Sequence, residues 1–219
     1  GPGCGLADGS SDGSSGTPNA ALYSRADLTI VGGGTLQVSG RCNDGITSTD
    51  GLAIRGGTLL VEAVDDGIRG KDYVVMRGGD VTVRSGGDGV KSDDDQDPAR
   101  GYVHIEAGTL EVEAGGDAVT AQTQVRVDDG RLTLRAGGGS ATVASGDGSA
   151  GRDRAPFGGV SGLDEAVSAK AVKGLASVLV SGGQLDIDAA DDAVHSNGMI
   201  RIEGGSFDIA TGDDAFHAD

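Results

Sequence analysis

The chain repeats itself every 22 residues, and this repeat constrains the fold more than any other feature of the sequence. The motif Asn43-Asp44-Gly45-Ile46 returns 22 residues later as Asp65-Asp66-Gly67-Ile68, and again as Gly87-Asp88-Gly89-Val90. Related motifs follow after longer steps at Gly116-Asp117-Ala118-Val119, Asp191-Asp192-Ala193-Val194 and Asp213-Asp214-Ala215-Phe216. A short fixed period is typical of a solenoid, in which each unit buries its apolar face by stacking on its neighbours. The longer steps indicate units of the same kind that carry loop insertions.

Each unit contains three short extended segments separated by glycine-containing turns. In the unit that starts at Asp191 these segments are 192–195, 199–202 and 206–209. Alternation such as that of Leu59 and Val61 turns one face of each strand inward. The pattern predicts an all-β fold, a right-handed parallel β-helix with about 22 residues per coil and seven to eight coils. A leucine-rich repeat would need a Leu-x-x-Leu-x-Leu pattern with Asn, and a calcium-binding roll would need a period of about nine residues.

We expect one domain at 19–219, preceded by a Gly/Ser-rich linker or lipoprotein-type tail at 1–18. Two insertions interrupt the repeat. The first is the acidic run around 93–98, and the second is a long loop at 138–168, which either is filler or contains one irregular coil. The sequence stops at Asp219, a few residues into a repeat, so we expect it to be cut from a longer protein.

The two cysteines, Cys4 and Cys42, lie far apart. Gly3-Cys4-Gly5 with the polar stretch after it resembles the mature start of a bacterial lipoprotein, in which Cys4 would carry lipid and tether the domain to a membrane. A fragment boundary before a linker explains the same residues, and a structural disulfide is a further alternative. No apolar run approaches the about 20 residues of a membrane span. We expect an extracellular or cell-surface location and a monomer.

The formal net charge is −17, which excludes nucleic acid as a partner because phosphate binding needs a basic face. Only six aromatic residues are present and none is Trp, so a flat stacking platform for a crystalline polysaccharide is missing. Cations, or anions bridged by cations, are therefore the expected partners.

Equivalent positions of successive coils stack about 4.8 Å apart, so the repeat predicts columns of carboxylates. Two bare carboxylates at that distance repel by about 3–4 kcal/mol at an effective dielectric constant near 20. Calcium takes six to eight oxygen ligands and suits such a column, although Asp before Gly also caps turns with its side chain. One predicted column contains Asp44, Asp66, Asp88 and Asp117, and a second contains Asp50, Asp72 and Asp94. The predicted calcium ligands are Asp44, Asp65, Asp66, Asp88, Asp93, Asp94, Asp191, Asp192, Asp213 and Asp214.

A column of different character stands three residues after the first. It contains Thr47, Arg69, Lys91, Thr120, Lys173 and His195, and His217 is equivalent to His195. Basic groups beside an acidic column suit calcium-bridged recognition of uronic acids, with Arg69, Lys91, Lys173 and His195 as the sugar-binding candidates. Charge balance between columns is the alternative. The two histidines with carboxylates could also bind a transition metal, or form a half-exposed pair of sugar hydrogen-bonding groups.

The repeat motifs resemble those of secreted bacterial β-helix proteins that bind cellulose and acidic sugars with calcium and share the fold of family 9 pectate lyases. The resemblance covers about 19–219 and is carried by Asn19-Ala20-Ala21-Leu22-Tyr23-Ser24, Asn43-Asp44-Gly45-Ile46, Asp65-Asp66-Gly67-Ile68-Arg69-Gly70-Lys71-Asp72, Gly87-Asp88-Gly89-Val90-Lys91-Ser92-Asp93 and Asp191-Asp192-Ala193-Val194-His195-Ser196-Asn197-Gly198. It implies carbohydrate binding rather than catalysis. Because this chain has few aromatics, the resemblance favours acidic sugars over cellulose.

Three functions follow from these residues. The preferred one is a calcium-dependent carbohydrate-binding protein for acidic plant or cell-wall polysaccharide. A second is a calcium-dependent polysaccharide lyase, in which Lys91, or next Lys173, removes the proton beside the uronate carboxylate. The third is a structural or adhesin β-helix that calcium makes rigid.

Overall fold

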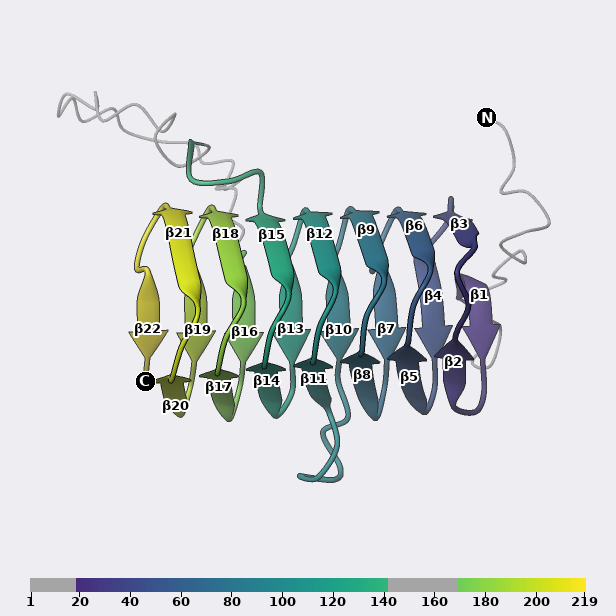
Figure 1. The fold of residues 1–219 in the computed structure, drawn as a ribbon, viewed down its shortest axis with the longest axis horizontal. Helices are drawn as coiled ribbons and strands as arrows, with labels where there is room; N and C mark the ends of the chain where they lie inside the picture. The colour runs from purple at the N-terminus through teal and green to yellow at the C-terminus, as the bar shows by residue number, and fades with distance from the viewer. Residues whose placement is uncertain (1–18, 142–168) are drawn as a thin grey trace, which may run out of the picture.

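The computed structural model describes residues 19–141 and 169–219, which form a parallel β-helix with three sheets (Figure 1). Sheet A contains β1 (Ala20–Ser24), β4 (Asp44–Ser48), β7 (Ile68–Gly70), β10 (Val90–Ser92), β13 (Val119–Ala121), β16 (Val172–Gly174), β19 (Val194–Ser196) and β22 (Phe216–Ala218). Sheet B contains β2 (Leu28–Ile30), β5 (Gly51–Ile54), β8 (Tyr73–Met76), β11 (Tyr102–Ile105), β14 (Gln124–Val127), β17 (Ser177–Val180) and β20 (Met199–Ile202). Sheet C contains β3 (Thr35–Gly40), β6 (Thr58–Ala63), β9 (Asp80–Ser85), β12 (Thr109–Ala114), β15 (Arg131–Ala136), β18 (Gln184–Ala189) and β21 (Ser206–Thr211).

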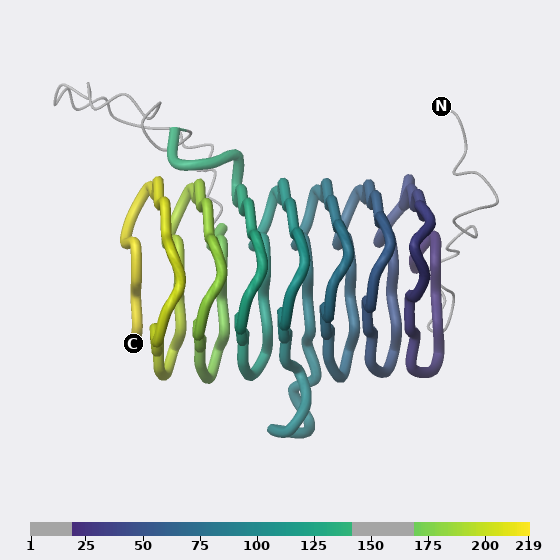
Figure 2. Tube along the Cα trace, in the orientation of Figure 1, coloured from purple at the N-terminus to yellow at the C-terminus, as the bar shows by residue number. Residues whose placement is uncertain are grey.

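Every strand pairs in parallel with the equivalent strand of the next coil. The described residues build seven coils of three strands each, followed by β22 as the first strand of an eighth. Figure 2 shows the coils advancing along one axis from the N-terminal to the C-terminal end, and they wind in the right-handed sense. The predicted fold class is therefore confirmed. The ends of all three strands of the seventh coil agree with the sequence prediction to within two residues.

The core consists of rows of aliphatic side chains that repeat from coil to coil. On sheet A, Ile46 pairs with Ile68 and Ile68 with Val90, and all three are buried. On sheet C, alternate residues such as Leu110 and Val112 point inward while Glu111 and Glu113 are exposed. A coil therefore removes its apolar side chains from water only where the next coil covers them.

The residue after the repeated aspartate is glycine in early coils and alanine in later ones. The aliphatic residue at the facing position of sheet C changes in the same coil. A Cβ on Gly67 would lie 2.2 Å from Val83 Cγ1 and 2.7 Å from the carbonyl oxygen of Gly89. Gly45 and Gly89 meet the same combination of a valine Cγ1 and a carbonyl oxygen. In the next coil the pair is instead Ala118 and a leucine, Leu134. The glycines at this position are thus required by close packing.

The insertions leave the stack at two corners. The acidic insertion projects between β10 and β11 (Figure 1). The long loop joins β15 to β16. Its residues 142–168, and with them the predicted irregular coil, lie outside the described part of the chain. On either side of it β13 pairs directly with β16 and β15 with β18.

Cys42 follows β3 and is disulfide-bonded. Cys4 and the predicted tail at 1–18 lie outside the described residues. Within the part of the chain that is described, no helix has the length and hydropathy needed to cross a membrane.

We expect Gly67→Ala to lower the free energy of unfolding by about 1–3 kcal/mol, because the added methyl group overpacks a filled core and cannot move the Gly89 carbonyl. Chemical denaturation of the variant measures this loss. Gly33→Ala is the matched control, since a Cβ there meets nothing within 4 Å, and its stability should be unchanged. Equal stability of the two variants would contradict the packing argument.

Candidate functional site

A row of aspartates follows the corner where sheet C leads into sheet A. The amide of Gly45 donates to the carbonyl of Asp66, that of Gly67 to Asp88, and that of Gly89 to Asp117. The predicted column of Asp44, Asp66, Asp88 and Asp117 is therefore confirmed. The row continues through Lys170, Asp192 and Asp214, since Ala118 donates to Lys170, Ala171 to Asp192 and Ala193 to Asp214. We call these seven residues the aspartate row.

Four carboxylates of this row, those of Asp66, Asp88, Asp117 and Asp192, each accept a hydrogen bond from the backbone of the following coil. Asp66 Oδ1 accepts from the amide of Asp88 at 2.9 Å, and Asp88 Oδ1 accepts from the amide of Asp117 at 2.9 Å. Asp117 Oδ1 accepts from the amide of Lys170 at 2.8 Å. Near the C-terminal end, Asp192 Oδ1 accepts from the amide of Asp214 at 3.2 Å. One oxygen of each aspartate thus holds two coils together, which is a structural role.

The second oxygens meet a row of donors on the outer face of sheet A, which we call the cation row. Strand register places Thr47, Arg69, Lys91, Thr120, Lys173, His195 and His217 in one line, as predicted. Lys91 Nζ lies 3.1 Å from Asp66 and 2.8 Å from Asp88. Lys173 Nζ lies 3.2 Å from Asp117. The repulsion expected between stacked carboxylates is therefore offset by Lys91, which stands between Asp66 and Asp88, and by Lys173 at Asp117.

Arg69 and Asp44 differ from this lysine pattern. Arg69 donates from Nε at 3.0 Å and from Nη2 at 2.7 Å to Oδ2 of Asp93, in the acidic insertion, and Oδ1 of that carboxylate is buried without a partner. Asp44 instead accepts from Thr47 and Asn19, each at 2.9 Å. Neutral donors and a cross-coil ion pair take the place of lysine in this part of the two rows.

Burial controls the ionisation of the row. It raises the pKa of Asp44, Asp66 and Asp117 above the usual aspartate value, against the opposing effect of their hydrogen bonds. For Lys91, desolvation acts to lower the pKa, but the carboxylates of Asp88 and Asp66 outweigh it and raise the pKa. Lys91 is consequently held as an ammonium ion.

The second predicted column brings Asp50, Asp72 and Asp94 together in successive coils. Asp72 donates its amide to the carbonyl of Asp50, and Asp94 donates its amide to the carbonyl of Lys71, which places Asp94 beside Asp72. Arg100 Nη1 lies 2.8 Å from Asp72 and 4.0 Å from Asp94. The acidic insertion leaves the coil after Asp94, and the chain returns to register at Gly101, whose amide donates to the carbonyl of Asp72. The buried carboxylate of Asp94 accepts from the amides of Gln96 and Asp97, and these bonds lower its pKa.

Few of the predicted calcium ligands converge. Among the described residues, three or more metal-ligating side chains bring their ligand atoms within 4.8 Å of one another in two groups, Asp191–Asp192–Asp213 and Asp192–His195–His217. Asp44, Asp65, Asp66, Asp88, Asp93 and Asp94 form no such group, and Asp214 stands outside both. The two groups share Asp192 and lie where the seventh coil meets the eighth.

The outer side of sheet C carries a groove that the sequence did not predict. Two hollows of about 590 Å³ and 340 Å³ adjoin across β3, β6 and β9, and the larger extends to β12. Both are lined by Ser39, Arg41, Glu62 and Arg84. Arg84 pairs with Glu113 at 3.4 Å, with both side chains about 60% exposed, whereas Arg41 makes no ion pair with any described residue. The period-2 pattern predicts that these residues face outward, but no sequence signal marks the hollow.

Lys170 is a further member of the aspartate row that was not predicted from the sequence. Its motif Lys170-Ala171-Val172 matches Asp192-Ala193-Val194 except for the first residue, and this match could have placed it in the aspartate row. Its Nζ contacts Asp191 at 2.7 Å. The row therefore changes sign once, between Asp117 and Asp192.

Comparison with known proteins places these features among carbohydrate-binding β-helices. A family described as "carbohydrate-binding domain-containing protein" matches residues 4–215. A protein of that description from Acetivibrio thermocellus is 48% identical over 46 residues, which are 21% of this chain and 16% of the relative. The solved structure titled "Structure of the polysaccharide lyase-like protein from C. thermocellum, Gadolinium derivative" is similar with a TM-score of 0.57 and 25% identity. That match covers 89% of this chain and 58% of the other, so the chain spans less than two thirds of either protein.

We expect stability to be greatest in mildly acid solution. The raised pKa values of Asp44, Asp66 and Asp117 give a contribution that is full below the unfolded pKa of 3.8 and is lost as the pH rises through the folded values. Asp94 and Asp128 have lowered pKa values, so their contribution is present above 3.8 and is lost as the pH falls through the folded values. The thermal midpoint should rise as the pH falls from 7 through the raised aspartate pKa values, and fall again in acid below 3.8. Asp117→Asn should reduce the rise, and a midpoint that falls steadily from pH 7 would contradict the argument.

Removing Lys91 should expose the repulsion in the aspartate row. We expect Lys91→Met to lower the free energy of unfolding by about 1–3 kcal/mol, because Asp66 and Asp88 lose their shared ammonium at a site that solvent screens only in part. The double variant Asp66→Asn/Lys91→Met should recover part of the loss in chemical denaturation. Lys71→Met is the control, since Lys71 forms no ion pair within the described residues. A single variant as stable as the unmodified protein would show that these pairs contribute nothing.

Proposed function

Because this chain belongs to the family of carbohydrate-binding domain-containing proteins, we propose that it binds an acidic polysaccharide along the outer side of sheet C. The observation that carries this proposal is the groove that Arg41 and Arg84 share. It crosses successive coils and so runs along the axis of the rod, which suits a linear polymer.

The chemistry of the groove favours a sugar with carboxylates. Arg41 is free of ion pairs within the described chain, and the single contact of Arg84 with Glu113 is long and exposed. A guanidinium group offers paired donors that match a carboxylate. Ser39, Gln37 and Thr82 add hydrogen-bonding groups suited to sugar hydroxyls. Among the described residues, the two hollows are lined by no aromatic side chain, which supports an acidic polymer over cellulose.

The cation row stays a second candidate surface. Arg69, Lys91 and Lys173 are already paired with aspartates, so a uronate would have to share them. His195 is buried, and its two ring nitrogens contact Asp192 and Asn197 at 3.0 Å each. These contacts favour a structural role for the row, and the variants below test both surfaces.

We further propose that binding is calcium-dependent. The carboxylates of Asp191, Asp192 and Asp213 supply the oxygen ligands that calcium prefers and lie close enough to share one ion. A bound ion would offset their charge and join the seventh coil to the eighth. Within this group Asp191 also contacts the ammonium of Lys170 at 2.7 Å, while Asp192 faces His195 and His217. In the row from Asp44 to Asp117, the ammonium of Lys91 stands between Asp66 and Asp88, and that of Lys173 contacts Asp117, so these residues suit calcium less.

Binding is favoured over lyase activity. A lyase needs a group that accepts a proton from the sugar. Lys91 contacts two carboxylates and its pKa is raised, so it remains protonated. The ion pairs that stabilise the row thereby remove the best candidate base.

We propose that the protein works outside the cytoplasm. The disulfide at Cys42 supports this location, because disulfides persist in oxidising compartments.

Calorimetric titration of polygalacturonate into chelator-treated protein, with and without calcium, tests the proposed function. We expect calcium-dependent heat and no response to an uncharged dextran. Arg41→Ala and Arg84→Ala should each weaken binding by about 10- to 100-fold, because a charge-assisted contact is lost. Arg201→Ala is the control, since Arg201 pairs with Glu203 on the outer side of sheet B and should not matter.

Two outcomes would overturn the proposal. Absence of binding with and without calcium would reject acidic polysaccharide as the ligand. Binding that survives the Arg41 and Arg84 substitutions but is lost in Arg69→Ala would move the site to the cation row.

A further inference from the structure

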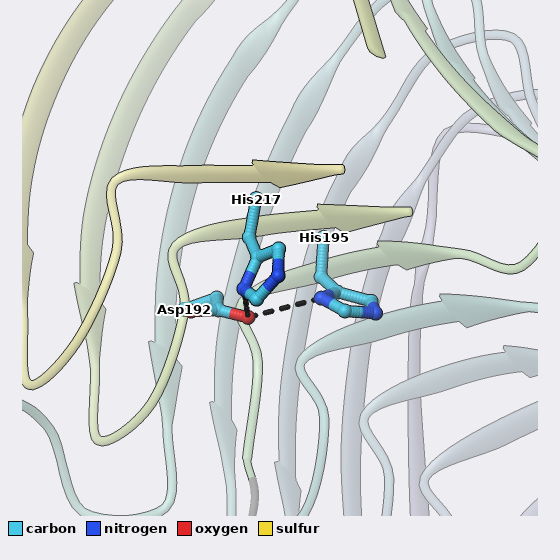
Figure 3. Close-up of side chains that lie close together, drawn as sticks. All are labelled: Asp192, His195 and His217. Atoms are coloured by element: carbon cyan, nitrogen blue, oxygen red, sulfur yellow. Dashed lines mark hydrogen bonds and ion pairs between the residues drawn. The ribbon is translucent and has the colours of Figure 1, made fainter. Parts of the chain in front are cut away.

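At the C-terminal end, the two rows on sheet A change from aspartate and lysine to aspartate and histidine. Asp192 precedes β19, His195 lies in β19, and His217 lies beside it in β22. Figure 3 shows both rings turned toward one carboxylate oxygen. Oδ2 of Asp192 is 3.0 Å from Nδ1 of His195 and 3.3 Å from Nδ1 of His217. Three groups that can ligate a metal therefore point at one another.

The far nitrogens of both rings already have oxygen partners. Nε2 of His195 lies 3.0 Å from Oδ1 of Asn197, and Nε2 of His217 lies 3.2 Å from Oδ1 of Asp219. A carboxylate or amide oxygen only accepts, so each Nε2 carries the hydrogen. In a neutral imidazole this leaves the lone pair on Nδ1, facing the acceptor oxygen of Asp192. Either a proton on Nδ1 or a metal ion bound by both atoms satisfies this contact.

We propose that Asp192, His195 and His217 form a binding site for a divalent transition metal ion, with zinc as the best match. Zinc takes histidine nitrogen and aspartate oxygen at about 2.0–2.2 Å in a tetrahedron, so adjacent ligand atoms stand about 3.3 Å apart. The distances of 3.0 and 3.3 Å agree with two edges of that tetrahedron. Asn197 and Asp219 are the outer partners that hold ligating histidines in the required orientation.

The ligand set separates this site from the calcium proposal. Imidazole nitrogen suits zinc, copper and nickel, whereas calcium prefers oxygen alone. The neighbouring calcium candidate consists of Asp191, Asp192 and Asp213 and contains no nitrogen ligand. Asp213 therefore belongs to one site, the two histidines to the other, and Asp192 to both.

A metal here would join the seventh coil to the start of the eighth. Three protein ligands leave a fourth position for water or for a carboxylate. Asp214 is a nearby candidate for that position, with Oδ2 at 3.6 Å from Nδ1 of His217. Such an ion would stabilise the end of the stack, because it binds the folded arrangement only.

Titration of chelator-treated protein with zinc, and with cobalt as a spectroscopic probe, tests the site without any polysaccharide. We expect one equivalent of zinc to bind and to raise the thermal midpoint, and cobalt to give the absorption of a tetrahedral nitrogen and oxygen site. His217→Gln and His195→Gln should abolish both signals. His217 is partly exposed on the last strand, so its replacement should leave the fold intact by circular dichroism.

His104→Gln is the matched control, because His104 contacts Asp128 on sheet B and belongs to no metal-ligating group among the described residues. Asp213→Asn should reduce calcium binding and leave zinc binding unchanged, while Asp219→Asn should weaken zinc by about 10-fold or more through the outer contact. Absence of saturable zinc binding, or binding that survives both histidine substitutions, would overturn the proposal. Neither result depends on whether the protein binds sugar.

Discussion

Register between successive coils is the constraint on which the rest of this structure depends. A coil has no interior of its own, and its strands find hydrogen-bond partners only in the coils before and after it. Pairing in register brings equivalent residues into rows, so aliphatic side chains pack on aliphatic side chains through the length of the stack. The same rule forces charged residues to stand beside their own kind. The core is thus obtained at the cost of electrostatic repulsion on the outer face of sheet A.

The chain resolves that repulsion with hydrogen bonds and interleaved cations. One oxygen of Asp66, Asp88 or Asp117 accepts an amide of the next coil, and the other meets Lys91 or Lys173. A lysine reaches between two coils, so one ammonium can serve two carboxylates. These hydrogen bonds and ion pairs therefore stabilise the contact between successive coils. The ion pairs also engage the lysine side chains that a bound uronate would need. This competition is the physical reason to place sugar binding in the groove on sheet C.

The faces of the rod therefore carry different functional groups. Sheet A carries the paired rows, sheet C carries the groove lined by Arg41 and Arg84, and the junction of the seventh and eighth coils carries side chains that could ligate a metal. At that junction histidine replaces lysine in the cation row. There the carboxylate of Asp192 contacts His195 and His217, whereas Asp66 and Asp88 share the ammonium of Lys91.

The sequence by itself determined the fold, because a 22-residue period with alternating aliphatic residues has one way to bury its apolar face. It also determined which residues share a row, since Asp44, Asp66 and Asp88 keep constant spacing. It could not determine what each carboxylate contacts. Lys91 lies between Asp66 and Asp88, where a metal was expected. The groove on sheet C and the convergence of His195 with His217 on Asp192 were decided by tertiary structure, because they depend on side-chain direction across coils, which spacing along the chain does not specify.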